Sequence, residues 1–143
     1  MKKIITLIIT AVCALQLVGC GEKPSDGAKI DYGTSSLYTR EEMDEAIELI
    51  KELFDSEYDG CELHSITYGG DSECNAENID WLNDIEKARD NEEHFTKCIM
   101  FKSNWHSPKV GYGSFEDDKE YTGWQWWLGR SEDGDWKFID CGY

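Results

Sequence analysis

Histidines and the common motifs of catalytic and metal-binding sites are scarce in this chain of 143 residues. Only three histidines occur, His64, His94 and His106, and they fall on different predicted elements. The sequence has no C-x-x-C or H-x-x-x-H spacing, no glycine-rich phosphate loop, no nucleophile elbow and no Ser-His-Asp order. These absences disfavour a zinc site and a serine or thiol hydrolase. No catalytic residue is assigned, and no metal or cofactor is expected.

Basic residues are also few, since 14 Lys and Arg stand against 30 Asp and Glu. Removal of a leader containing Lys2 and Lys3 leaves 12 basic residues against 30 acidic ones, a net charge of −18. So acidic a surface repels nucleic acid and anionic lipid headgroups, and it favours cationic partners. Nucleic acid is therefore not an expected partner. The acidic clusters at 71–73 and 116–120 lack the loop pattern of an EF-hand, so they are interpreted as solvated loops.

One long apolar run is present, and it lies at the start of the chain. Two lysines precede it, and it ends in Leu-Val-Gly-Cys at 17–20. Because the run is shorter than the roughly 20 residues that span a bilayer, residues 1–19 are predicted to be a secretory signal peptide. The small residues directly before Cys20 resemble the lipobox of bacterial lipoproteins. The alternative is an ordinary cleaved signal peptide followed by a chance cysteine.

The lipobox resemblance implies cleavage before Cys20, a diacylglycerol thioether on its sulfur and acylation of the new amino terminus with fatty acids such as palmitate. Several acyl chains together give stable anchoring. The implied location is the extracytoplasmic face of the cell membrane, with the membrane itself as a partner through the lipid. Gly21 follows the cysteine in place of the aspartate that retains some lipoproteins at an inner membrane. Which membrane carries the protein is left open.

The mature chain is predicted to consist of a flexible tether at 20–37 and a single domain at 38–143. Residues 21–36 are rich in Gly, Ser, Lys and Asp and contain few large apolar side chains. Thr39 and Glu42 then form a capping box, and apolar residues at helical spacing predict a helix from Arg40 to Tyr58. A second helix is predicted from a cap at Asn75 to about Asn91.

A strand is predicted at 61–68, where alternation fails between Leu63 and Ile66 and indicates a bulge or a change of buried face. Another is predicted at 94–106, where 98–101 is apolar on both faces. The last 23 residues predict a β-hairpin, because two aromatic-rich runs flank an Asp-Gly step within 131–135. Alternation places Trp124, Trp126 and Leu128 on one face and Trp127 on the other. The aromatic faces are interpreted either as core or as a surface for a ligand or partner.

These elements predict an α+β fold in which two amphipathic helices pack on a curved, mainly antiparallel four-stranded sheet, in the order helix, strand, helix, strand, strand, strand. That order resembles the NTF2-like and cystatin-like folds. The motifs Trp124-Gln-Trp, Arg130, Asp133-Gly, Trp136 and the final Asp-Cys-Gly-Tyr, with Gly-Cys-x-Leu at 60–63, resemble those of small bacterial lipoprotein domains of unknown function. The resemblance covers about 38–143. It implies the fold and no activity.

Four cysteines remain once Cys13 is removed and Cys20 is lipidated, and an even number in an extracytoplasmic compartment favours disulfides. A pair between Cys61 and Cys74 is disfavoured, because the strand between them separates them too far. The preferred pairing joins Cys61 with Cys141 and Cys74 with Cys98. The alternative is that some are free, buried thiols. The lipoprotein-domain pattern includes neither Cys74 nor Cys98, so it gives these pairs no support.

The leading hypothesis is a non-catalytic, lipid-anchored extracytoplasmic module that binds a protein, glycan or small ligand through aromatic residues. The candidate ligand-binding residues are Trp105, His106, Tyr121 and Trp127. A second hypothesis is a small NTF2-like cone enzyme of the isomerase or hydratase type, or a ligand-sequestering pocket, with Tyr68, Tyr121, Asp140 and His106 turned inward. A third is an envelope immunity or inhibitor lipoprotein whose acidity matches a basic target.

Overall fold

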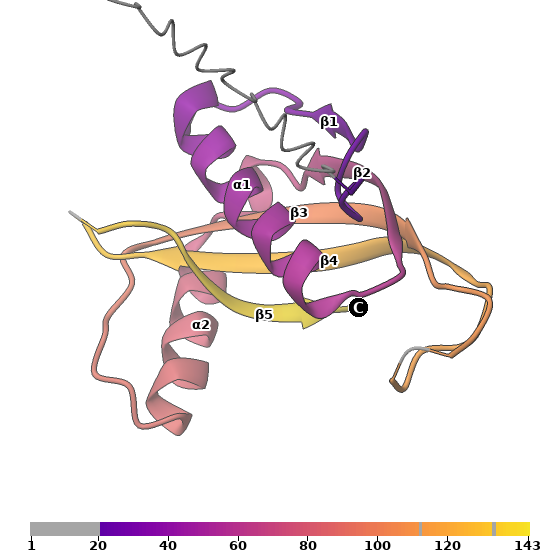
Figure 1. Ribbon diagram of the computed structural model, residues 1–143. Coiled ribbons are helices and arrows are strands. Elements are labelled where there is room, and N and C mark those ends of the chain that lie inside the picture. Colours follow the sequence, from indigo (N-terminus) through magenta and orange to yellow (C-terminus); the bar gives the residue numbers. More distant parts are fainter. Residues whose placement is uncertain (1–20, 112, 133) are drawn as a thin grey trace, which may run out of the picture.

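The computed structural model describes residues 21–111, 113–132 and 134–143 (Figure 1). The predicted signal peptide and the predicted lipidation site at Cys20 lie outside these residues. The described chain forms two α-helices and one five-stranded sheet with the strand order β1-β2-β3-β4-β5. The strands are β1 (Lys29–Asp31), β2 (Glu62–Tyr68), β3 (Lys97–His106), β4 (Glu120–Arg130) and β5 (Lys137–Gly142).

The predicted four-stranded antiparallel sheet is wrong, because a fifth strand adds a parallel pairing at one edge. β1 pairs with β2 in parallel, with Ile30 opposite Ile66, whereas the other neighbours are antiparallel. The sheet is therefore mixed, although the α+β class holds. The strand was missed because it is three residues long and falls in the range 20–37 that was interpreted as a flexible tether. So short a strand gives no alternation signal, and its pairing depends on the open edge of β2.

Side-chain hydrogen bonds hold the segment before α1 (Arg40–Glu57) against the domain. Ser25 is buried and donates to the carboxylate of Asp55 on α1 through both its amide and its hydroxyl, each at 2.8 Å. Asp71 accepts from the Ser36 amide and hydroxyl, each at 2.8 Å, and from the Ser35 hydroxyl. These hydrogen bonds, with Ser35 contributing most, lower the pKa of Asp71. The carboxylate therefore fastens 35–36 to the loop that follows β2.

Helix α1 confirms the strongest prediction from the sequence. The Thr39 hydroxyl accepts from the Glu42 amide at 3.2 Å, and the Glu42 carboxylate accepts from the Thr39 amide at 2.9 Å. One stripe of the helix is buried, and its members are Met43, Ala46, Ile47, Ile50 and Phe54. This stripe packs on the sheet face that carries Ile99, Phe101, Trp126 and Leu128. Figure 1 shows α1 crossing that face diagonally.

Helix α2 (Ala76–Ala88) begins after the predicted cap at Asn75 and covers part of the opposite sheet face. Leu82 of the helix packs there with Cys98, Met100, Trp127 and Ile139. The alternation along β3 explains the two faces, because Cys98 and Met100 point to α2 while Ile99 and Phe101 point to α1. All four side chains are buried, which confirms the prediction of a strand covered on both sides. The sheet is thus the middle of three layers.

The terminal hairpin is confirmed, since β4 and β5 pair antiparallel on either side of 131–136. The predicted bulge in β2 is also present as a register shift between Leu63 and Ser65. A second irregularity, opposite the Trp127–Leu128 step, pairs Trp127 with Asp140 but Leu128 with Phe138. It places Cys141 on the α1 face, although Ile139, two residues earlier, lies on the α2 face.

Candidate functional site

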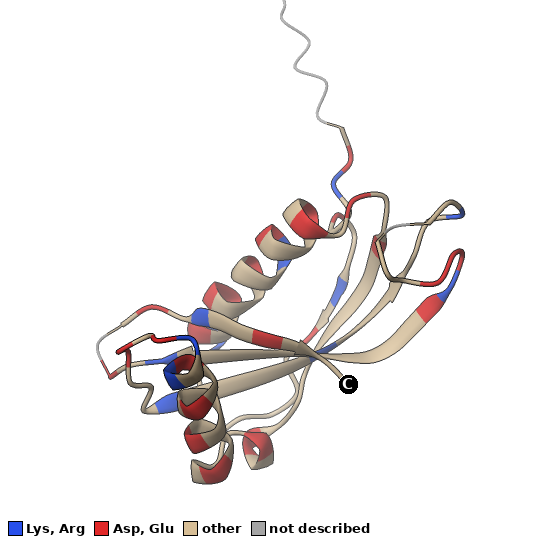
Figure 2. Cartoon of the chain, turned by 90° about the horizontal axis from the view of Figure 1, so that it is seen from below, with Lys and Arg blue, Asp and Glu red and all other residues tan. Residues whose placement is uncertain are grey.

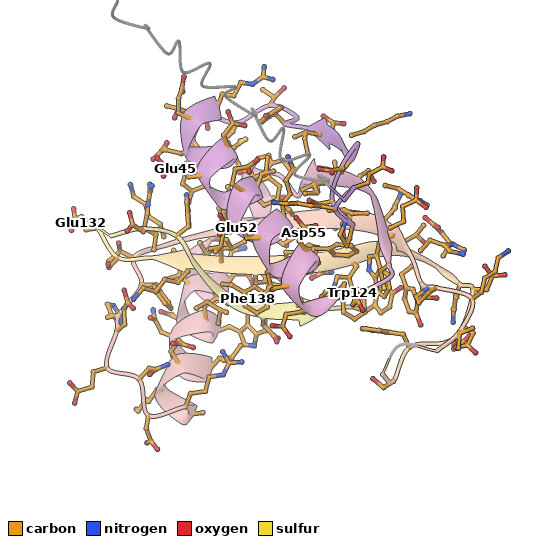
Figure 3. All side chains as sticks on the ribbon, in the orientation of Figure 1. Glu45, Glu52, Asp55, Trp124, Glu132 and Phe138 are labelled. Carbon is orange, nitrogen blue, oxygen red and sulfur yellow. The ribbon has the colours of Figure 1, made fainter. Side chains whose placement is uncertain are left out.

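Two of the candidate ligand-binding residues, Trp105 and Tyr121, are part of the core. Their rings stack face to face with centroids 4.2 Å apart, and Trp105 has no exposed surface. Phe115 packs edge-on against both rings, and the Tyr121 hydroxyl accepts from the Glu116 amide at 2.9 Å. Rings enclosed in this way stabilise the β3–β4 end of the sheet. Figure 3 shows Trp124, which meets Trp105 edge to face, and Phe138 on the sheet beside α1.

His106 lies in a polar corner on the other side of β3. Its Nδ1 is 3.1 Å from Glu120 and its Nε2 is 3.0 Å from Asp118. Glu120 also meets His64 Nδ1 at 3.0 Å, so one carboxylate joins two imidazoles. Carboxylates only accept hydrogen bonds, so two such contacts suit an imidazolium with both nitrogens protonated. Asp118 first, then Glu120, raise the pKa of His106.

Trp127, the fourth candidate, lines a groove between α2 and the strands β4 and β5. We call it the α2 groove; it encloses about 290 Å³, and its lining includes Asn78, Trp81, Gln125, Trp127, Asp140 and Tyr143. This volume is near the lower end of the range for small-molecule sites, roughly 300–1,000 Å³. The groove exists because α2 covers only part of the sheet, which leaves the carboxyl-terminal part of β5 open beside the helix.

The aromatic wall of the groove is made by Trp81 and Trp127. Their rings meet edge to face with centroids 5.3 Å apart. Trp127 is 8% exposed and serves as the base, whereas Trp81 is 39% exposed and presents ring surface to solvent. Trp81 is not among the predicted site residues, because it lies on the flank of α2 beside its apolar stripe. A tryptophan just outside the buried stripe of a helix was the available signal.

Polar side chains complete the groove. The Trp127 indole donates to Gln125 Oε1 at 3.0 Å, so the Gln125 amide nitrogen is left for other acceptors. Asn78 donates to the Glu73 carbonyl at 2.7 Å, which fixes its side chain and leaves its own oxygen as an acceptor. The Asp140 carboxylate has no hydrogen-bond or ion-pair partner among the described residues. The groove therefore offers hydrogen-bond donors and acceptors beside an aromatic surface.

The residues named for a cone enzyme do not converge. Tyr121 is in the α1-side core, and the Tyr68 hydroxyl donates to Asp71 at 2.8 Å. Asp140 lines the α2 groove, while His106 lies in the polar corner with Glu120. Within the described ranges, no group of three or more His, Cys, Asp or Glu is arranged to hold a metal ion.

All four cysteines of the domain are free thiols in the structure. Cys61 and Cys98 are buried, while Cys74 and Cys141 are partly exposed. No disulfide joins any of them, so the structure does not support the predicted pairs. Cys98 Sγ is 3.6 Å from the carbonyl of Glu73, the residue before Cys74. Cys141 Sγ is 3.5 Å from the Tyr58 hydroxyl, and the Cys61 amide donates to the Tyr58 carbonyl at 3.0 Å.

Comparison with known proteins adds no relative to this geometry. No protein-family model, no curated protein and no solved structure matches the chain. Among the described residues, neither helix has the length and apolarity needed to cross a membrane.

Proposed function

We propose that this protein is a non-catalytic binding module, held by lipid on Cys20 at the extracytoplasmic face of the cell membrane, whose α2 groove binds a glycan. The observation that carries the proposal is the exposed ring of Trp81, supported edge-on by Trp127 beside the polar side chains of Gln125 and Asp140. A sugar ring has an apolar face that stacks on an indole and hydroxyls at its rim that pair with amides and carboxylates.

The chemistry of the groove favours a neutral or amino-sugar glycan over an acidic one. Asp140 supplies a carboxylate without a cationic partner among the described residues, and lysine and arginine are absent from the lining. A sulfated or uronic-acid ligand meets repulsion there, in addition to that of the whole acidic domain. Hydroxyl and N-acetyl groups instead fit the Gln125 donor and the Asn78 and Asp140 acceptors.

Titration of the purified protein with defined oligosaccharides tests the glycan site. Linear N-acetylglucosamine and glucose tetramers serve as neutral probes, and a galacturonic acid tetramer serves as the acidic control. We expect saturable heat release in calorimetry, with a change in indole fluorescence, for at least one neutral probe and none for the acidic one. Binding of the acidic probe alone contradicts the assignment.

Substitution of Trp81 locates the binding. Trp81→Ala is expected to weaken the neutral probe at least tenfold, because an exposed aromatic anchor commonly contributes more than about 1.4 kcal/mol. Trp81→Phe should retain part of the affinity. Val110→Ala is the matched control, since Val110 is also an exposed apolar residue, at 84%, and does not line the groove. Unchanged affinity in Trp81→Ala, with a native circular dichroism spectrum, places the ligand elsewhere.

The lipid anchor is tested separately in cells. The wild-type protein should incorporate an alkyne-tagged palmitate and should partition into the detergent phase of a detergent extraction. Cys20→Ser should abolish both the labelling and the partitioning. Labelling of Cys20→Ser, or no labelling of the wild type, contradicts a lipid anchor on Cys20. Neither result bears on ligand binding in the α2 groove.

A basic protein is the second candidate partner, as an immunity or inhibitor lipoprotein requires. The solvent side of α1 carries a row of carboxylates, including Glu41, Glu45, Glu48 and Glu52 (Figures 2 and 3). Such a surface attracts a basic partner at low ionic strength. Capture that falls with salt and is lost in a Glu45→Lys and Glu52→Lys double variant, with no binding of neutral oligosaccharides, favours this candidate over the glycan.

A further inference from the structure

We propose that Cys74 and Cys98 form a redox-active dithiol that closes to a disulfide, with Cys74 as the attacking thiolate and Cys98 as the resolving thiol. This inference concerns a modification site and stands independently of the glycan site. Of the three ways in which the sequence allows four cysteines to pair, the proposal selects the one that joins Cys74 with Cys98, and it gives each of these two cysteines a role.

The two thiols are neighbours through the backbone that leads into α2. Cys98 Sγ is 3.6 Å from the Glu73 carbonyl, and the next peptide nitrogen belongs to Cys74. Cys74 also packs against the apolar cluster that contains Cys98. The Cys74 amide donates to the Asp71 carbonyl at 3.1 Å within the 3-10 turn at Asp71–Glu73, and the Gly69 amide donates to the Met100 carbonyl of β3 at 2.9 Å. The pair is thus pre-positioned by an ordered turn.

The surroundings give the two cysteines different roles. Cys74 is partly exposed and directly precedes the N-cap Asn75, where the positive end of the α2 dipole stabilises an anion. The Tyr68 hydroxyl lies 3.3 Å from its sulfur. The Cys98 thiol first, then the Tyr68 hydroxyl, lower the pKa of Cys74 against the effect of burial. Cys98 is fully buried, and its pKa is raised by the Cys74 sulfur and by burial.

The reaction requires a disulfide oxidant, such as oxidised glutathione or a disulfide oxidoreductase of the cell envelope. The Cys74 thiolate attacks one oxidant sulfur, forms a mixed disulfide and expels one thiolate. The Cys98 thiol then loses its proton, attacks Cys74 Sγ and expels the second thiolate. Two electrons pass to the oxidant, and the two protons of the protein thiols end on its two products. Only Cys74 has to be reached from solvent.

The other two cysteines serve as internal controls, although Cys141, like Cys74, is partly exposed beside a tyrosine hydroxyl. Cys61 is 4% exposed, and burial raises its pKa to about 11. Cys141 contacts the Tyr58 hydroxyl, whose own pKa is raised chiefly by burial. Neither sulfur lies at a helix N-terminus. We therefore expect both to react with oxidants much more slowly than Cys74.

The test uses the lipoprotein extracted in detergent and reduced, then exposed to oxidised glutathione. After blocking of free thiols and proteolysis, mass spectrometry should find one internal link, between the peptides of Cys74 and Cys98. Cys61→Ser should retain the link and Cys74→Ser should lose it. Cys98→Ser should instead retain one glutathione on Cys74, because the resolving thiol is missing.

The glutathione adduct expected in Cys98→Ser distinguishes the attacking from the resolving cysteine even if Cys74→Ser folds poorly. In the wild type, Cys74 should react with a chromogenic disulfide at least tenfold faster than Cys61 or Cys141. A link that joins Cys61 or Cys141 to any partner, a stable glutathione adduct on the wild type, or equal reactivity of all four thiols overturns the proposal. So does the absence of any link after prolonged oxidation.

Discussion

Gly129 in β4 is the position where one added methyl group should cost the most. A Cβ built on it lies 2.6 Å from Cγ of Phe95, with two further ring atoms within 3.0 Å. The ring has little room to retreat, because Phe95 is fully buried and its backbone is held on both sides by Asn83 of α2. The Phe95 amide donates to the Asn83 side chain at 2.7 Å, and that side chain donates back to the Phe95 carbonyl at 2.9 Å.

Two opposing effects decide the size of the change in Gly129→Ala. Replacing glycine by alanine inside a strand by itself stabilises by roughly 0.5–1 kcal/mol. Forcing a methyl group into a packed core costs about 1–3 kcal/mol, and a rigid ring at 2.6 Å puts this case at the upper end. The expected net loss is about 2 kcal/mol. For a domain of this size that corresponds to a melting temperature lower by roughly 8 °C.

Urea denaturation followed by tryptophan fluorescence measures the loss. Gly21→Ala is the control, because a Cβ there meets nothing within 4 Å. In a Phe95→Leu background, Gly129→Ala should cost at least about 1 kcal/mol less than in the wild type, which is the signature of a direct clash. Additive effects in this cycle, or a Gly129→Ala variant within about 0.5 kcal/mol of the wild type, refute the reasoning.

Three further predictions concern charged groups. Because the pKa of His106 is raised in the folded state, the stability that its protonated ring gives the fold is complete below pH 6.5 and is lost as the pH rises through the folded-state pKa. His106→Gln should therefore lower the urea midpoint more at pH 6 than at pH 8. A larger effect at pH 8 contradicts the ion pair. The Glu42 carboxylate lies 2.6 Å from Arg130, and Arg130 first, then the Thr39 amide, lower the pKa of Glu42. The contribution of Glu42 to folding stability is therefore present above pH 4.5 and is lost as the pH falls through the folded-state pKa. Glu42→Gln should cost about 1–2 kcal/mol at pH 7 and little at pH 3, while the exposed control Glu45→Gln should cost under about 0.5 kcal/mol at both. Asp71→Asn should release 33–37, seen as faster amide exchange there and unchanged exchange in β3.

The predicted elements that proved correct have local causes. The first helix follows from a capping box and an apolar stripe within 18 residues, and the hairpin follows from alternation on both sides of a short turn. Both are settled by contacts between residues close in sequence. The bulge in β2 was likewise visible as a break in alternation. By contrast, β1 has no local signal, because its three residues become a strand only when β2 offers an open edge.

The candidate site shows the same division. Aromatic residues were recognised as important, but whether a ring is core or surface depends on which helix covers it. Trp105 and Tyr121 lie under α1 and are enclosed. Trp81 of α2 instead contacts Trp127 of β4 at the side of the helix where the sheet is left uncovered. Residues 81 and 127 are far apart in the chain, so their contact has no sequence pattern.

The amino-acid order by itself determined the acidic character, the two helices and the closing hairpin, because charge, hydrophobic period and capping are properties of short segments. Only the tertiary structure decided that the sheet is mixed and that the helices cover opposite faces of it. It also decided that the Cys98 sulfur lies against the carbonyl of Glu73, the residue before Cys74. Those outcomes depend on contacts between residues distant along the chain, and such contacts exist only once the layers have packed.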